Sequence, residues 1–376
     1  MFLALRELRF ARGRFALMGA VVTLIAVLVV LLSGLSVGLA NDGVSGLQRM
    51  PVTSFAFQKN VSEGSAFSRS VVDEEAVEAW AGHEGVAAAA PFGNVLVNAR
   101  TDRDVEIDLA LFGVETGSFL DPAVAFGASP MDEGQVVISA TAAEEGIDVG
   151  DTIILQPSEA ELEVVGVLAD QHTFGHVDVG YLPLRSWQEA RSGIREGDVV
   201  PDQVYEEFTA VGVQLQEGAD LDLAAVDEAA GTTSLTREES YGASPGYTAE
   251  TMTLQLIQWF LFAISALVIG AFFTVLTIQR RREIAVLRAL GASTRYLLRD
   301  SLVQSVVLLV VSAGAGIGIG LAAGAGISST TVPFALDPGA IVAAALALVL
   351  LGLLGAATAV LRITRVDPLT ALGGSR

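Results

Sequence analysis

Long apolar runs and one long mixed segment alternate along this chain of 376 residues. A helix needs roughly 20 apolar residues to cross a hydrocarbon core of about 30 Å. Four runs meet that length, and they predict membrane-spanning helices over 15–40, 254–278, 301–327 and 340–361. The segment 41–253 is water-soluble in character, and 328–339 is a short outside loop. The chain therefore predicts four spans with one large domain inserted between the first two.

Alternating apolar and polar positions in the inserted segment predict strands, and two-sided patterns predict short helices. The expected strands are 94–99, 105–114, 135–139, 152–155, 162–168, 177–182 and 205–215, and the expected helices are 74–80, 184–192 and 221–230. The polar run 231–245, rich in Gly, Ser and Thr, predicts a linker back to the membrane. The fold class is thus a membrane protein with four transmembrane α-helices and a large α+β extracytoplasmic domain.

Charge orients the spans. Thirteen of the 22 basic residues lie in 1–14, 279–300 and 362–376, which the positive-inside rule assigns to the cytoplasm. The segment 41–253 holds the other nine basic residues and 38 of the 43 acidic ones, a net charge of −29. Both termini are therefore predicted inside and the domain outside. The apolar run of the first span is about 25 residues, longer than the 7–15 of a signal peptide, which predicts an uncleaved anchor.

Composition narrows the chemistry. The chain has no cysteine, which excludes disulfides, thiolate metal sites and cysteine nucleophiles. His172 and His176 are four residues apart in HTFGH, but the Glu of a metalloprotease helix is missing, so His176 is predicted to be a structural residue of the domain and no metal site is expected. The carboxylates show no paired pattern. We predict no catalytic residue and no nucleic-acid partner.

A glycine repeat marks the third span. Gly316, Gly320 and Gly324 recur every four residues, which places a flat groove on one helix face. No strand precedes this run, so close helix packing is favoured over a nucleotide-binding loop.

Three motifs carry a family resemblance: LALRELRFARGRFAL (3–17), TIQRRREIAVLRALGAST (277–294) and RITRVDPLTALGG (362–374). With the order of one span, a large outside domain and three spans, they resemble the FtsX-like permeases of ABC transporters, also called MacB-type or type VII exporters. VGVLADQHTFGHVDVGYLPL (165–184) and VPFAL (332–336) are more narrowly similar to heme-exporting permeases of Gram-positive bacteria.

The resemblance implies a homodimer in the lipid bilayer, bound to two copies of a separate ABC ATPase subunit. The sequence independently excludes a P-loop, because a Walker A motif needs Gly-Lys-Ser/Thr and the sole lysine, Lys59, lies in Gln-Lys-Asn. This chain is therefore not expected to be an enzyme. Segment 279–300 becomes a coupling helix that docks on the ATPase. Its expected contact residues are Arg282, Glu283, Ile284, Leu287, Arg288, Leu290 and Gly291.

Heme is then the implied cargo, and the chain has no intrinsic cofactor. A heme site needs an axial ligand and an apolar slot. The candidates near the outer ends of spans 1 and 2 are Met50, Met252, Tyr247, Tyr241, Gln48, Phe55 and Trp259. Methionines and aromatics are also routine in cores and interfacial belts, so packing roles stay open for all of them. Two other functions remain: a permease for another amphiphile, such as a lipid, lipoprotein or peptide antibiotic, and a relay that activates a cell-wall hydrolase without transport.

Overall fold

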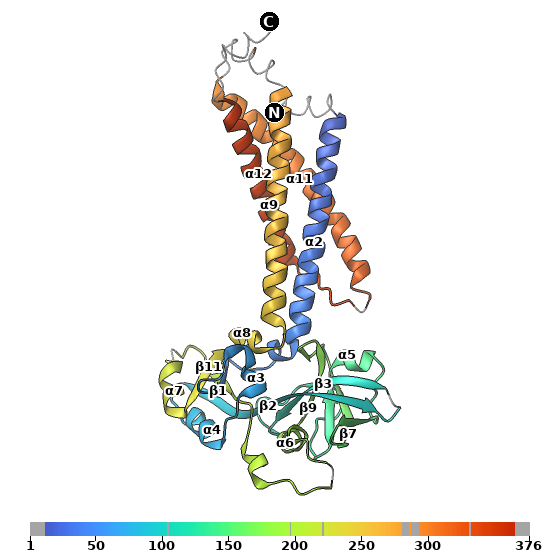
Figure 1. Cartoon of the computed structure of the whole chain (residues 1–376), viewed down its shortest axis with the longest axis vertical. Helices are drawn as coiled ribbons and strands as arrows, with labels where there is room; N and C mark the ends of the chain where they lie inside the picture. Colours follow the sequence, from blue (N-terminus) through green and yellow to red (C-terminus); the bar gives the residue numbers. More distant parts are fainter. Residues whose placement is uncertain are drawn as a thin grey trace. The chain divides into compact units, whose positions relative to one another are not determined.

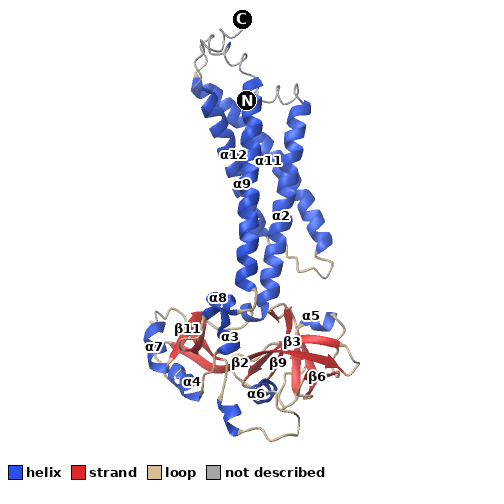
Figure 2. Cartoon of the chain, in the orientation of Figure 1, coloured by secondary structure: helices blue, strands red, loops and turns tan. Residues whose placement is uncertain are grey.

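The computed structural model describes residues 12–103, 105–195, 197–219, 222–279, 286, 293–330 and 332–364. The chain divides into two compact units, Met1–Leu39 with Met252–Arg376, and Ala40–Thr251. The first, here called the membrane unit, is helical, and the second, the inserted domain, holds all the described strands (Figures 1 and 2). The predicted fold class is confirmed.

A mixed sheet forms the inserted domain. Its eleven strands are β1 (Ser54–Gln58), β2 (Val86–Thr101), β3 (Glu106–Val114), β4 (Val124–Gly127), β5 (Gln135–Ile138), β6 (Thr152–Gln156), β7 (Glu161–Leu168), β8 (Thr173–Phe174), β9 (Val177–Pro183), β10 (Ala210–Leu215) and β11 (Thr232–Thr236). The order is β11-β1-β10-β2-β3-β9-β5-β7-β4, with β6 between β2 and β7 and β8 on β9. Only the pairs β3–β9 and β5–β7 are parallel.

Short helices cover the sheet: α3 (Ala66–Arg69), α4 (Glu74–Ala81), α5 (Ala140–Glu144), α6 (Leu184–Ser192), α7 (Leu223–Ala230) and α8 (Arg237–Ser240). Helix α6 is seated by two glycines. Gly93 of β2 and Gly113 of β3 are directly paired, and a Cβ on either would collide with the indole of Trp187, which is fully buried. The missing side chains create the slot that the largest residue of α6 fills.

One hydrophobic core of the inserted domain contains many aromatic rings, mostly packed edge to face. Phe67 of α3 contacts Phe55, Phe57, Phe92 and Phe174, with ring centroids 5.0–6.2 Å apart. Such pairs add about 0.5–1.5 kcal/mol each beyond the area they bury. This aromatic core packs around the strands that lead back to the ends of the two long helices bordering the domain.

The predicted linker 231–245 is wrong. Residues Thr232–Thr236 form β11, which pairs antiparallel with β1, and α8 and a single 3₁₀ turn, Tyr241–Ala243, follow it. Thr236 and Glu239 complete a capping box at the start of α8. Leu235 and Thr232 are buried, so the segment is ordered by a strand partner far away in the sequence.

Four long helices pass through the membrane unit: α2 (Arg12–Gln48), α9 (Tyr247–Gln279), α11 (Thr294–Ile327) and α12 (Pro338–Thr364), all labelled in Figure 1. All four are long and apolar enough to span a membrane. All four are longer than the predicted spans. On the side of the inserted domain, α2 continues eight residues past 40 and α9 begins seven residues before 254. These extensions carry polar residues into the inserted domain.

The glycine repeat of α11 serves close packing, as predicted, and two of its three glycines, Gly316 and Gly320, pack against α2. A Cβ on Gly316 would lie 2.5 Å from both the Ala26 Cβ and the Thr23 carbonyl oxygen, and one on Gly320 would lie 2.8 Å from the Val30 Cβ. The hydroxyl of Thr23 also donates to the Ser312 carbonyl at 3.0 Å. Small residues allow the two backbones to approach closely, which is the main source of helix affinity in lipid.

The loop between α11 and α12 also rests on α2. The Phe334 ring occupies the space beside Gly34 and Gly324, where a Cβ on either glycine would collide with it. The Ala335 N–H donates to the Gly34 carbonyl at 3.1 Å. On the other side of the bundle, a Cβ on Gly355 of α12 would lie 2.6 Å from the Ala266 carbonyl of α9.

Candidate functional site

The last two turns of α2 belong to the inserted domain. Val44 and Leu47 are fully buried there, while Gly43 and Gly46 let other chain segments approach the helix. A Cβ on Gly46 would lie 3.0 Å from Val179 Cγ2. The helix therefore continues past the predicted span because its apolar side joins the domain core.

A tight hairpin holds this helix end. Strands β8 and β9 are joined by Gly175 and His176, which both have positive φ angles, 60° and 66°. Two successive positive φ values define the type I′ turn that suits the twist of a two-residue hairpin. Non-glycine residues rarely adopt a positive φ, although histidine does so more often than most, so any backbone strain here is small.

Backbone and hydroxyl groups fix the hairpin to α2. The Gly175 N–H donates to the Gly43 carbonyl at 2.9 Å, and the Ser244 hydroxyl donates to the same oxygen at 2.9 Å. The Thr173 N–H donates to Ser45 Oγ at 2.9 Å, and the two hydroxyls of Thr173 and Ser45 are 2.7 Å apart. These buried hydrogen bonds contribute about 0.5–1.5 kcal/mol each, and leaving one partner unpaired costs more.

His176 lies between two carboxylates on different long helices. Its Nδ1 is 2.9 Å from Oδ2 of Asp42, on α2, and its Nε2 is 2.9 Å from Oε2 of Glu250, on α9. The contact with Asp42 is aligned as a hydrogen bond, whereas the contact with Glu250 is within ion-pair distance without that alignment. Asp42, His176 and Glu250 together are called the histidine clasp below.

Neighbouring groups orient the clasp. The second oxygen of Asp42 accepts from Gln171 Nε2 at 3.0 Å. Arg49, one residue beyond α2, pairs with Asp170 at 3.0 Å and donates to the Gln171 carbonyl at 2.9 Å. The Arg49–Asp170 pair is exposed and contributes little energy. Its geometry nevertheless ties the loop before the hairpin to the same helix end.

The other histidine of the HTFGH run has a different environment. Burial, and secondarily the charge of Arg49, lowers the pKa of His172 to about 4. Its Nδ1 is 3.2 Å from the Tyr181 hydroxyl, and the two rings are edge to face. His172 is consequently neutral at pH 7. The described residues contain no group of three or more His, Asp or Glu side chains arranged to hold a metal ion.

The predicted heme-site residues lie in several environments. Met50 and Phe55 are 2% and 0% exposed in the core of the inserted domain, so heme could reach them only if that core opened. Tyr241 and Tyr247 form an edge-to-face pair with centroids 6.1 Å apart. Burial raises the pKa of Tyr241.

The remaining candidates lie on helices. Gln48 Nε2 is 3.5 Å from the side-chain oxygen of Asn41. Met252 and Trp259 project from α9 and are 64% and 69% exposed. All seven predicted ATPase-contact residues, from Arg282 to Gly291, lie outside the described residues.

Sequence reasoning missed the partners of His176. Asp42 and Glu250 are 134 and 74 residues from it in the chain, and nothing local pairs them with a hairpin. The only available signals were the polar residues Asn41 and Asp42 at the end of an apolar run and a Gly-His turn between two strands.

Four spanning helices with an α+β domain between the first and second define a multi-pass membrane protein of the permease class. Residues 16–230 match the family model described as MacB-like periplasmic core domain, and residues 256–368 match FtsX-like permease C-terminal. The chain belongs to this FtsX/MacB-like family of ABC transporter permeases, and its domain is the extracytoplasmic one.

Full-length relatives support this assignment. The chain is 25% identical over 377 residues to "Putative hemin transport system permease protein HrtB" of Staphylococcus haemolyticus (strain JCSC1435), covering 100% of this chain and 99% of the relative. It is 23% identical over 384 residues to an uncharacterized ABC transporter permease of Mycobacterium tuberculosis (strain ATCC 25618 / H37Rv), with the same coverage. The periplasmic region of MacB from Actinobacillus actinomycetemcomitans is similar at 11% identity and a TM-score of 0.37, covering 51% of this chain and 92% of that one.

Proposed function

We propose that this chain is the permease subunit of an ABC exporter that expels heme from the cell membrane, driven by a separate ATPase subunit. The observation that carries the mechanism is the histidine clasp. One imidazole contacts carboxylates on α2 and on α9, so both helix ends are attached to one hairpin of the extracytoplasmic domain. A movement of α9 is then passed to the domain and to α2 together.

Force enters from the cytoplasm in this proposal. A permease of this family implies an ATPase partner, and the sequence offers no Walker A motif of its own. Both termini and the 279–300 connector are placed in the cytoplasm by the positive-inside rule, because they carry most of the arginines that flank the spans. Two ATPase subunits dock on the connectors of two permease chains, and their closure moves α9.

A second copy of the chain covers α9. Met252, Leu256, Trp259, Phe260 and Leu267 form an exposed stripe along one face, each 57–72% exposed. A stripe of large side chains can face lipid or another helix, and a homodimer places it at the two-fold interface. That arrangement presents Met252 and Trp259 of both chains to the same space.

Heme as cargo is supported by the full-length relatives named as hemin permeases and by the chemistry of this stripe. An apolar macrocycle partitions into bilayers and needs a flat apolar surface with an axial ligand. In the membrane unit, Trp259 supplies such a surface and Met252 a thioether ligand. In the inserted domain, the paired phenols of Tyr241 and Tyr247 are separate ligand candidates. Met50 is left out because it packs inside the core.

The test is a hemin titration of the permease with its ATPase subunit in nanodiscs, read by the Soret band. Met252→Ala, Tyr241→Phe and Tyr247→Phe are compared with wild type. Met131→Ala and Tyr205→Phe are matched controls, since Met131 is 71% exposed in the domain and Tyr205 donates to Glu189 instead. We expect a saturable, shifted band that weakens in at least one of the three site variants and in neither control.

A negative hemin titration would leave two other functions, which further measurements distinguish. If hemin only partitions, equally into all five variants and empty nanodiscs, heme is not the cargo. A different amphiphile is then indicated if ATP still drives efflux of lipids or peptide antibiotics in the same particles. Loss of every efflux signal with intact ATPase stimulation points to a relay acting on a cell-wall hydrolase.

A further inference from the structure

The extracytoplasmic domain has a pocket that the proposed function does not use. It has a volume of about 320 Å³ and lies where β2 loses its neighbour on one side. The first residue of β10, Ala210, pairs with Phe92, and the last residue of β6, Gln156, pairs with Asn98. Within the described residues, no strand pairs with β2 on that side between these two positions. The pocket is therefore a gap in the sheet.

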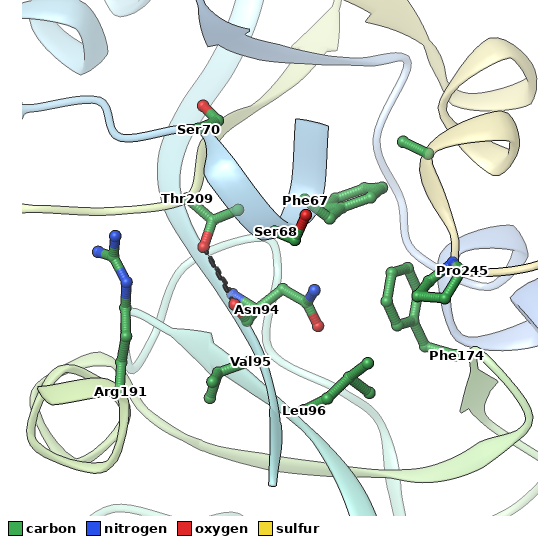
Figure 3. A pocket seen from close by; sticks show the side chains of 11 residues that line it. Phe67, Ser68, Ser70, Asn94, Val95, Leu96, Phe174, Arg191, Thr209 and Pro245 are labelled. Atoms are coloured by element: carbon green, nitrogen blue, oxygen red, sulfur yellow. Dashed lines mark hydrogen bonds between the residues drawn. The ribbon is translucent and has the colours of Figure 1, made fainter. Parts of the chain in front are cut away.

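At one border of the gap, a side chain makes the backbone hydrogen bonds that a neighbouring strand would make. The Asn94 N–H donates to the Thr209 hydroxyl at 2.9 Å, and that hydroxyl donates to the Asn94 carbonyl at 3.3 Å (Figure 3). Thr209 thus substitutes for a strand partner. In an antiparallel ladder alternate residues face the same neighbour, so the N–H and C=O of Leu96 face the gap just as those of Asn94 face Thr209. These groups form a short open strand edge.

The side chain of Asn94 adds an unused acceptor. Asn94 is 6% exposed, and its Oδ1 has no hydrogen-bond partner among the described residues. Its amide extends from β2 toward Phe174 and Leu96 (Figure 3). A buried carbonyl oxygen without a donor costs about 1–3 kcal/mol. A ligand with an N–H at this position removes that cost.

The rest of the lining is mixed, with Ser68 and Ser70 beside apolar groups. Phe67 and Phe174 contribute ring surface, and Leu96, which is 46% exposed, and Pro245 lie at the rim. The sole cation, Arg191, is already engaged, 3.6 Å from Glu207 and 5.4 Å from the Trp187 ring centroid. The pocket is suited to a neutral ligand with amide groups and an apolar side chain.

We propose that this pocket binds a free peptide of two or three residues in extended form, as an added strand beside Leu96. The peptide backbone exchanges hydrogen bonds with Leu96, one peptide N–H donates to Asn94 Oδ1, and an apolar side chain packs on Phe174. The volume and the paired strands at both borders exclude a longer insert along the edge. The pocket contains none of the three clasp side chains, although Phe174 belongs to the hairpin that carries His176.

The probe is N-acetyl-Ala-Leu-Ala-amide, titrated into the full permease in nanodiscs and followed by saturation-transfer difference NMR. Its analogue with a methyl group on the leucine nitrogen keeps the apolar side chain but loses the central N–H. We expect saturable binding of the probe to wild type and at least about tenfold weaker binding of the analogue, equivalent to about 1.4 kcal/mol.

Asn94→Leu locates the site. Because the replaced oxygen is unpaired, this variant is expected to keep the thermal midpoint of wild type or exceed it, while probe binding weakens at least about tenfold. Asn98→Leu is the matched control, four residues along the same strand, exposed and outside the pocket, and is expected to bind as wild type. Absence of saturable binding to wild type overturns the proposal, as does equal binding by the methylated analogue or by Asn94→Leu.

Discussion

The Nδ1 atom of His176 lies 2.9 Å from Oδ2 of Asp42, 134 residues earlier in the chain. This contact attaches a hairpin of the extracytoplasmic domain to the helix that comes out of the first span. Because the opposite ring nitrogen lies beside Glu250, one side chain serves both long helices that border the domain.

Replacement of His176 by Asn tests the clasp. Asparagine also tolerates a positive φ, so the hairpin turn is expected to survive, but its short side chain cannot bridge Asp42 and Glu250. We expect ATP-driven efflux to fall at least about tenfold while the unfolding free energy drops by only about 1–3 kcal/mol, the cost of losing one part-buried charged contact. Efflux is measured in proteoliposomes, and the loss of stability is measured by thermal melts. His83→Asn is the control, because the His83 imidazole lies in a loop and makes a solvent-exposed hydrogen bond with the Glu84 carbonyl. Efflux equal to wild type in His176→Asn would remove the clasp from the mechanism.

His172 predicts a pH dependence of stability. Its pKa falls from an ordinary 6.5 to about 4 in the folded protein, so between these values the unfolded chain binds a proton that the folded one does not. Stability from this group is complete above pH 6.5 and is lost as pH decreases toward 4, by up to about 1.4 kcal/mol per pH unit. His172→Gln removes this dependence. Asp178, whose pKa is raised by burial, acts in the opposite direction in both proteins and cancels in the comparison. Thermal melts of wild type and His172→Gln give the stability difference between the two proteins at pH 7 and at pH 5. An equal difference at both pH values would contradict the assignment.

The glycine groove of α11 can be filled selectively. Gly316→Val places methyl groups against Ala26 and Thr23, and overpacking of this kind costs about 1–3 kcal/mol. Gly318→Val, two residues away on the same helix, meets no atom within 4 Å of its Cβ. We expect the first variant to lower the thermal midpoint in detergent and the second to leave it nearly unchanged. Equal midpoints would show that α11 does not need the close approach to α2.

The absence of cysteine makes the homodimer directly testable. A single Leu256→Cys on the exposed stripe of α9 is expected to form a disulfide-linked dimer in native membranes under mild oxidation. Val342→Cys on α12, which is equally exposed at 57%, is the control and should stay monomeric. Crosslinking of both or neither, seen on a non-reducing gel, would contradict a two-fold interface along α9.

The coupling segment gives a functional prediction. Leu287→Asp puts a charge on the apolar face expected to dock on the ATPase and should uncouple ATP hydrolysis from efflux. Arg299→Asp, which changes charge at the far border of the connector, is the comparison variant. Normal efflux by Leu287→Asp, measured beside ATPase activity, would refute the coupling role.

Much of the architecture follows from local pattern. The helices 74–80 and 184–192 were predictable because their apolar positions repeat at helical spacing, and the strands of β5, β6, β7 and β9 because theirs alternate or run continuously. Strand β11 was missed because Thr232–Thr236 has only one large apolar side chain, Leu235, and owes its conformation to pairing with β1. Long-range pairing is invisible to a local pattern.

The site was less predictable for a related reason. His176 was expected to be structural, but its partners come from helix extensions that hydropathy alone places outside the helices. Met50 looked like a ligand because it follows the first span, yet α2 carries it into the aromatic core, where Leu47 and Met50 are buried. Depth in the membrane cannot be read from sequence once a helix continues into a folded domain.

The ring of Phe334, seated between Gly34 of α2 and Gly324 of α11, has a mechanical consequence. Together with the contacts of Gly316 and Gly320, this ring resists rotation of α2 against α11. A turn of α2 about its own axis by one residue, about 100°, would bring Ile25 or Val27 in place of Ala26 and Ser33 or Leu35 in place of Gly34. These larger side chains do not fit the close contacts, so the packing opposes torsion of α2 and favours movement of α2 and α11 as one body.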